Sequence, residues 1–225
     1  MPDLLSSLGV VAVVFSVLGG DLTGHAVITK RLSKKAVSSA TYNLRGTTAP
    51  VATFEEQTVN EYERMVVILD GPKAQAKAPE TLVIAQRNGR FEPDLVVAPV
   101  GSTVQFPNFD PIFHNVFSLS HAQSFDLGFY PKGQSRSVKF NREGIVQVYC
   151  HIHANMYAAI VVTASPWYTK PGADGSFSWT NLPAGHYKLT VWHTVAGSFH
   201  AETDVPEVGP AEVTIRVPID TGEGH

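Results

Sequence analysis

The single cysteine of this chain is followed at short, regular spacing by two more residues that can bind a soft metal ion. His153 follows Cys150 by three residues, Met156 follows His153 by three more, and His114 lies 36 residues before Cys150. A thiolate, two imidazoles and a weak thioether are the ligands of sites in which copper alternates between Cu(I) and Cu(II). The four residues therefore predict one mononuclear type 1 copper site that passes single electrons.

Each of these residue types also has an ordinary structural use. A lone Cys is most often a small buried hydrophobe, and Met fills gaps in cores. The combined spacing nevertheless favours a ligand set, because a strand-like run ends at Cys150 and another resumes just after Met156. The remaining histidines share no spacing with a second ligand set. His151 lies inside the same loop, but strand alternation from Cys150 should turn its ring away from the metal.

The sequence predicts that the elements which position these residues are all β-strands. Short apolar runs are broken by turn signals at close intervals, which is typical of an all-β sandwich. No helix is required between residues 81 and 164. The expected strands of this block are 81–86, 95–100, 103–108, 115–120, 135–140, 145–150 and 158–164.

Two further β-rich pieces flank this block, and neither has enough strands for a core of its own. Their expected strands are 25–29, 65–71, 175–180, 186–193 and 212–217. We therefore expect a discontinuous outer domain, 21–77 paired with 166–220, with the block 78–165 inserted between its halves.

The inserted block closely resembles the cupredoxins, the plastocyanin and amicyanin group of blue copper proteins. The resemblance rests on the C-x-x-H-x-x-M loop, on F-H-N-V around His114, and on an upstream pattern of Phe91, Pro93, Leu95, Val97, Gly101, Val104, Phe106 and Asn108. The stretch 171–193 resembles the carboxypeptidase regulatory-like, transthyretin-like sandwich. The whole chain looks like bacterial proteins called methylamine utilisation proteins, a label that we do not carry over.

The resemblance implies a Greek-key cupredoxin β-sandwich plus a second small β-sandwich. It also implies roles for single residues. His114, Cys150, His153 and Met156 would be the copper ligands, with Met156 in the axial position. Asn115 would donate a hydrogen bond to the Cys150 sulfur and so tune the reduction potential. Ala154 departs from the family pattern, which often has Pro directly after the loop histidine.

The composition and the N-terminal segment limit the possible functions further. The chain has 17 Lys and Arg against 20 Asp and Glu, with no long block of like charge, so nucleic acid is not an expected partner. The apolar run from Leu8 to Leu18 predicts a signal peptide over 1–20, hence a periplasmic or secreted protein. That run is too short for a membrane span, so we expect no integral span in the mature chain.

The expected function is electron transport and not enzyme catalysis, because no catalytic set is visible. A binuclear electron-transfer copper centre needs two cysteines, and this chain has one. Redox proteins would dock transiently at the exposed His153 edge, on an apolar patch of Pro111, Ile112, Phe113 and Ala154. Two other functions stay open at this point. One is copper storage or delivery; the other is an extracellular binding module in which the copper site is vestigial.

Overall fold

The computed structural model describes residues 19–29, 60–72 and 75–218. Within these residues all the regular structure is β-strand, apart from one short 3-10 helix, η1 (Glu61–Arg64). The all-β prediction is confirmed. None of the helices in this part of the chain is long and apolar enough to cross a membrane. The predicted signal peptide falls outside the described residues except at its end, where Gly20 begins the first strand.

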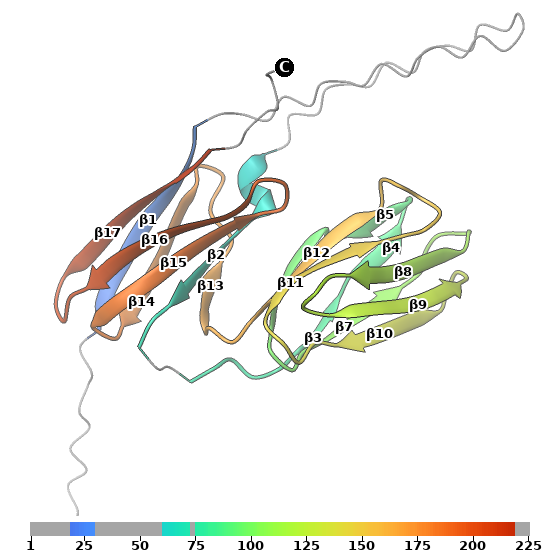
Figure 1. Cartoon of the computed structure of the whole chain (residues 1–225), viewed down its shortest axis with the longest axis horizontal. Helices are drawn as coiled ribbons and strands as arrows, with labels where there is room; N and C mark the ends of the chain where they lie inside the picture. The colour runs from blue at the N-terminus through green and yellow to red at the C-terminus, as the bar shows by residue number, and fades with distance from the viewer. Residues whose placement is uncertain (1–18, 30–59, 73–74, 219–225) are drawn as a thin grey trace, which may run out of the picture.

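The middle of the chain forms what we call the central body, drawn on the right of Figure 1. It has a sheet of order β6-β12-β11-β8-β9, a facing sheet of order β10-β7-β3, and the hairpin β4-β5. Its strands are β3 (Thr81–Val83), β4 (Ala85–Arg87), β5 (Arg90–Glu92), β6 (Leu95–Pro99), β7 (Thr103–Pro107), β8 (His114–Leu119), β9 (Ser124–Tyr130), β10 (Ser135–Lys139), β11 (Gly144–Tyr149) and β12 (Tyr157–Thr163).

Strands from the two ends of the chain pair with one another in what we call the flanking body, on the left of Figure 1. One sheet has the order β14-β1-β17 and the other β13-β2-β15-β16. The strands are β1 (Gly20–Ile28), β2 (Met65–Asp70), β13 (Trp167–Thr169), β14 (Ser176–Leu182), β15 (Gly185–His193), β16 (Gly197–Val205) and β17 (Pro210–Val217). The exact domain limits at 77/78 and 165/166 stay a prediction.

Strand β12 explains how the two bodies are joined. Its residues are buried on both faces, which is why the sequence there is continuously apolar instead of alternating. Ile160 and Val162 point into the core between the two main sheets of the central body. Ala159 and Val161 point the other way, into a small cluster shared with Val66, Leu95 and Trp192. One strand therefore serves the core around the site and the contact with the flanking body.

Four strands were not expected from the sequence: the three-residue strands β5 and β13, and the longer strands β9 and β16. Strand β9 contains Asp126 and Gly128, residue types that are depleted in strands. Strand β16 turns Phe199, Ala201 and Thr203 toward the protein, and only one of these is a large apolar residue. Both longer strands are edge strands that pair along one side with a well-marked neighbour, β8 and β15 respectively. Pairing therefore decides these two strands, since their own sequence favours them only weakly.

The buried hydroxyl of Ser165 lies where the chain passes from β12 of the central body to β13 of the flanking body. Ser165 Oγ donates to the Leu69 carbonyl at 2.6 Å and accepts from the Trp167 amide at 3.2 Å. Replacing Ser165 with alanine leaves both backbone groups without this partner, so we expect a loss of about 1–3 kcal/mol of unfolding free energy. Urea unfolding followed by fluorescence measures it. Ser198→Ala, at an exposed position of β16, is the control and should stay within about 0.5 kcal/mol of the parent. Equal stability of both variants would show that the hydroxyl is dispensable.

Candidate metal centre

The loop that carries Cys150 connects two neighbouring strands of the larger central sheet. Strand β11 ends at Tyr149 and β12 begins at Tyr157, and these two residues face each other across the ladder. Val146, Val148 and Cys150 alternate along one face and point into the central core, which leaves Cys150 only 5% exposed. The Met156 amide donates to the His153 carbonyl at 3.0 Å and closes the loop in a tight turn. Strand alternation and loop length thus place the thiol inside the protein.

His114 reaches the same point from the adjacent strand. It is the first residue of β8, it is fully buried, and β8 pairs with β11 at Phe117 and Tyr149. The distance from Cys150 Sγ to His114 Nδ1 is 3.9 Å, and that to His153 Nδ1 is 4.0 Å. Ligand atoms of these three residues all lie within 4.8 Å of one another. Three of the four predicted ligands are therefore grouped, although 36 residues separate the first from the second.

These distances fit a single metal ion between the three side chains. Metal–sulfur and metal–imidazole bonds of about 2.3 and 2.0 Å, at trigonal angles, put the two ligand atoms about 3.7 Å apart. The observed sulfur-to-nitrogen separations are close to this value. Met156 is 1% exposed and belongs to the core cluster that contains Cys150. Its axial role stays a prediction, as does the identity of the metal.

Asp110 is a residue of this site that the sequence interpretation did not find. Its carboxylate accepts the Asn88 amide at 2.6 Å and the Gly89 amide at 2.9 Å, and it lies 2.7 Å from His114 Nε2. A carboxylate on Nε2 leaves the Nδ1 lone pair free to face Cys150 and fixes the orientation of the ring. The signal in the sequence was weak, a carboxylate four residues before the histidine and an Asn-Gly turn far upstream.

The electrostatics of Asp110 follow from these contacts. Burial is the largest single influence and raises the pKa of the carboxyl, but the hydrogen bonds from Gly89, His114 and Asn88 together lower it below its usual value. Asp110 is only 6% exposed, so water does not compete for its oxygens. The side chain is therefore an ionised anchor between the hairpin β4-β5 and the His114 ring.

The side chain of Asn115 is directed to Asp126, and its amide nitrogen donates to Asp126 Oδ1 at 2.6 Å. The expected hydrogen bond from Asn115 to the Cys150 sulfur stays a prediction. The pairing of β8 with β9 shifts register between Asn115 and Phe117, and this irregularity brings Asp126 beside the amide. Asp126 also accepts the Gly128 amide, and that bond, followed by the one from Asn115, lowers the pKa of Asp126.

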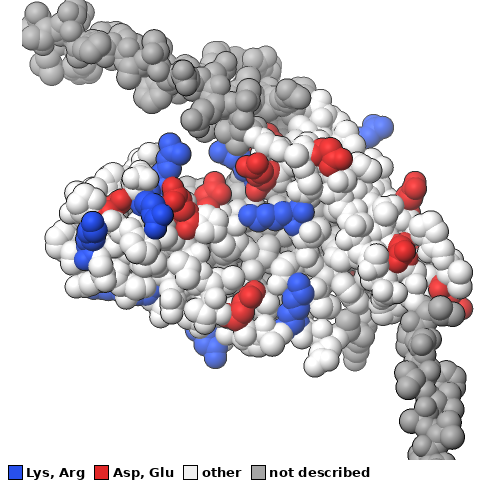
Figure 2. Space-filling model, turned by 180° about the vertical axis from the view of Figure 1, so that it is seen from behind, with Lys and Arg blue, Asp and Glu red and all other residues white. Residues whose placement is uncertain are grey.

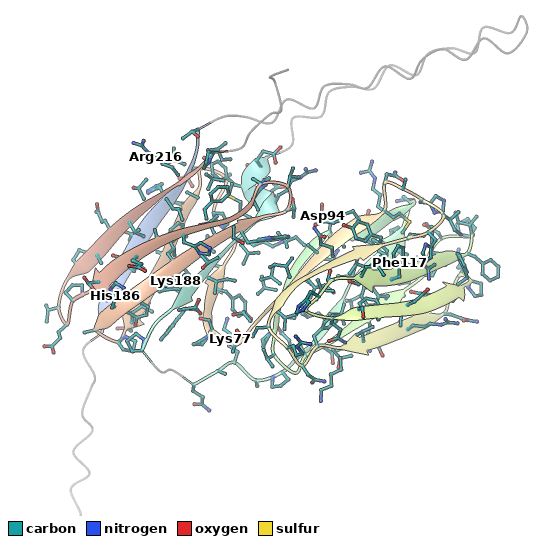
Figure 3. The ribbon with its side chains drawn as sticks, viewed as in Figure 1. Lys77, Asp94, Phe117, His186, Lys188 and Arg216 are labelled. Carbon is teal, nitrogen blue, oxygen red and sulfur yellow. The ribbon has the colours of Figure 1, made fainter. Side chains whose placement is uncertain are left out.

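His151 lies next to Cys150 in the sequence but belongs to a different surface. Its ring stacks on Phe117, with centroids 3.9 Å apart and an interplanar angle of 7°, and its Nε2 lies 3.8 Å from Asp126 Oδ2. Figure 3 labels Phe117 in the central body, far from His186 and Lys188 in the flanking body. Alternation along the strand thus turns His151 away from Cys150, as expected.

Two histidines of the flanking body, His186 and His193, have carboxylate partners. His193 is fully buried, and burial lowers its pKa although Glu61 Oε2 lies 3.1 Å from its Nε2. Its Nδ1 accepts the amides of Val195 and Ala196, so the ring holds a turn together. His186 is exposed, and its contact with Asp204 raises its pKa. Among the residues with described positions, only His114, Cys150 and His153 form a metal-ligating group.

The predicted docking residues are close in sequence to His114 and His153, and all of them are exposed. Ile112 and Phe113 are 47% and 55% exposed, and Pro111 and Ala154 are exposed as well. Phe109 and Ile152, at 47% and 53%, were not expected there. Both lie in the same loops as the expected residues, Phe109 two residues before Pro111 and Ile152 two residues before Ala154.

Comparisons with known proteins give partial likenesses. No family model matches the chain, and no curated protein matches it. Similar solved structures include a copper-containing nitrite reductase from Thermus scotoductus, with 24% identity over 42% of this chain and 24% of that one, at a TM-score of 0.35.

Two smaller proteins are also similar to part of the chain. A purple cupredoxin from Nitrosopumilus maritimus is 23% identical over 36% of this chain and 99% of its own, with a TM-score of 0.34. Amicyanin from Paracoccus versutus is 22% identical over 37% of this chain and 81% of its own, with a TM-score of 0.35. The chain spans about a quarter of the nitrite reductase, and the all-β architecture rests on the strand pairing described above.

Proposed function

We propose that this chain is an exported type 1 copper protein that transfers single electrons between redox partners. The observation that carries the proposal is the group of His114, Cys150 and His153, whose ligand atoms lie within 4.8 Å of one another and whose first two members are buried. Bound copper would supply a Cu(I)/Cu(II) couple at this position. The thiol and two imidazoles would hold the ion, and the Met156 thioether would be its weak axial neighbour.

The surroundings of the group suit electron transfer because they limit rearrangement. The His114 ring is anchored by Asp110, and Cys150 is packed among core residues at the end of β11. Ligands that are held in place change little when an electron arrives or leaves, so little reorganisation is needed. His153 is only partly buried and adjoins the exposed apolar side chains, which gives partners a short route to the site.

A carrier is favoured over an enzyme or a copper-storage protein. The described residues contain a single metal-ligating group, whereas a copper nitrite reductase needs further histidines for a second copper centre. Storage requires an ion that exchanges readily, and exchange is opposed by two buried ligands, His114 and Cys150, the first of which is anchored by Asp110. The same proposal includes export of the protein and the likeness of the outer domain to regulatory-like sandwiches. It also includes the domain limits, 21–77 with 166–220 for the outer domain and 78–165 for the inserted one.

Optical and EPR spectra of the purified protein with Cu(II), followed by voltammetry, test the proposal. An intense visible charge-transfer band and a reversible one-electron wave are expected. A colourless Cu(II) complex would argue for a vestigial site. A coloured complex that lacks a reversible wave and loses Cu(I) readily to a chelator would argue for storage or delivery.

Replacing Met156 with leucine should keep the colour and raise the reduction potential. A thioether stabilises Cu(II) slightly more than an alkyl group does, so its loss favours Cu(I). A tenfold change in relative affinity for the two states corresponds to about 59 mV for one electron, and we expect a rise on this order. Voltammetry measures it. Met65→Leu, in the core of the flanking body, is the matched control and should not move the potential. An unchanged potential in Met156→Leu would show that the axial role is misassigned.

A further inference from the structure

The end of the central body that holds the metal group exposes four large apolar side chains. Phe109, Ile112, Phe113 and Ile152 are each between 47% and 55% exposed, and we call them the apolar tip. They come from the loop before β8, which leads directly into His114, and from the loop after β11, which contains His153. Exposed apolar side chains gathered at one place usually mark an interaction surface.

Cationic side chains border the apolar tip on one side. Arg87 and Arg90 face each other across the hairpin β4-β5, and the Arg87 guanidinium lies 4.9 Å from the centre of the Phe109 ring. Lys132 is exposed in a turn next to Phe109. The backbone of this turn hydrogen-bonds to both the amide and the carbonyl of Asn108, the residue before Phe109. We call these three residues the cationic rim. Figure 2 shows Lys and Arg side chains, among a few acidic ones, at the left-hand end, which carries β4 and β5.

Few nearby carboxylates offset this charge. Asp110, the acid next to Phe109, is buried and bonded to the hairpin amides and to His114. Glu92 is exposed on β5 opposite Ala85, two residues beyond Arg90. Asp126 is exposed on the opposite side, where it contacts Asn115, Gly128 and His151. The cationic rim is therefore a local excess of positive charge.

The charge of the rest of the protein has the opposite sign. The chain carries a net charge of −3, and exposed acids such as Glu202, Asp204 and Glu212 lie on β16 and β17 of the flanking body. The strand ends that supply the metal group lie at the far end of the central body from these strands (Figure 1). A molecule that is positive at the site and negative elsewhere is oriented by an approaching charge.

We propose that the apolar tip and cationic rim dock a redox protein whose contact face is acidic around an apolar centre. The inference rests on the proposed electron-transfer function and names the chemistry of the partner. Carboxylates of the partner would meet Arg87, Arg90 and Lys132, and its apolar centre would cover the tip beside His153. Opposite charges speed the encounter, while a small apolar contact lets the partners separate afterwards.

Two inorganic oxidants and an acidic polymer test the surface in the full-length copper protein. Stopped-flow measurements follow transfer of one electron from the Cu(I) protein to anionic hexacyanoferrate(III) or to cationic tris(phenanthroline)cobalt(III). The rate constant with hexacyanoferrate(III) should fall as salt is added, and the one with the cobalt complex should not. Poly-L-glutamate should inhibit the hexacyanoferrate(III) reaction at low salt. Charge steering changes such rates by about 10- to 1000-fold, and we expect the lower end here.

Charge-reversal variants assign these effects to the rim. Arg90→Glu combined with Lys132→Glu should slow hexacyanoferrate(III) about tenfold at low salt and weaken inhibition by poly-L-glutamate. Lys188→Glu with Arg216→Glu makes the same charge change on the flanking body and should leave the rates within about twofold. Arg87→Gln is a milder third variant that tests the rim without reversing a charge. The visible copper band of each variant shows that the site is intact.

The outcomes separate the two proposals. A protein with no visible copper band or no reversible wave overturns the proposed function itself. A normal copper site whose rates ignore both salt and the rim variants overturns the acidic partner alone. Tighter binding of the rim to vesicles of anionic phospholipid than to poly-L-glutamate would also overturn it, in favour of a membrane surface.

Discussion

Replacing Cys150 with serine is expected to abolish the intense visible band of the Cu(II) protein completely. The band requires charge transfer from a thiolate to copper, and a serine hydroxyl neither ionises near neutral pH nor forms a comparably covalent bond. Cys150 is buried beside His114 and His153, and it is the single sulfur atom in that metal-ligating group. Absorption and EPR spectra after titration with Cu(II) provide the measurement.

The control for this prediction lies one residue away in the same loop. His151→Ala removes an imidazole that stacks on Phe117 and is turned away from Cys150, so the blue colour should remain. Serine is nearly isosteric with cysteine, so the Cys150→Ser protein should keep its fold. Circular dichroism of both metal-free variants checks this. A Cys150→Ser protein that stays blue, or a His151→Ala protein that loses its colour, would contradict the ligand assignment.

Replacing Asp110 with asparagine should weaken copper binding by about 10- to 100-fold and raise the reduction potential. Changes to the partners of metal-bound histidines typically cost this much affinity. Both Asp110 oxygens accept hydrogen bonds, one from Asn88 and the other from Gly89, and His114 Nε2 lies 2.7 Å from the second. An amide puts a donor where one oxygen now accepts. It also removes a negative charge that favours Cu(II) over Cu(I).

Competition with a chelator of known affinity measures the first effect, and voltammetry measures the second. Asp94→Asn makes the same charge change at an exposed position just before β6, which is an edge strand of the larger central sheet and is separated from β11 by β12. Neither affinity nor potential should change in that control. If Asp110→Asn bound copper as tightly as the parent, the carboxylate would merely brace the hairpin and would not position the His114 ring.

Much of this architecture could be predicted from local sequence patterns. The alternation of apolar residues and the turn residues between them predicted most of the strands. In a half-buried strand every second side chain faces the core, so the sequence alternates between apolar and polar residues. The three-residue steps from Cys150 to His153 and Met156 marked a loop short enough to hold several ligands on one strand connection. The same reasoning did not find β9 and β16, whose own residues favour strands weakly and whose pairing partners decide their conformation.

What the sequence determined by itself is the set of chemically capable residues and the all-β class, since both depend on residue type and near-neighbour spacing. Only the tertiary structure decided which distant residues meet. The pairing of β8 with β11 brings His114 to Cys150, and the hairpin β4-β5 brings two amides to Asp110. It also turned the Asn115 amide to Asp126 and left Phe109 and Ile152 exposed in the two loops next to the ligands. These contacts join residues far apart in the chain, and the free energy that selects them comes from packing the whole core.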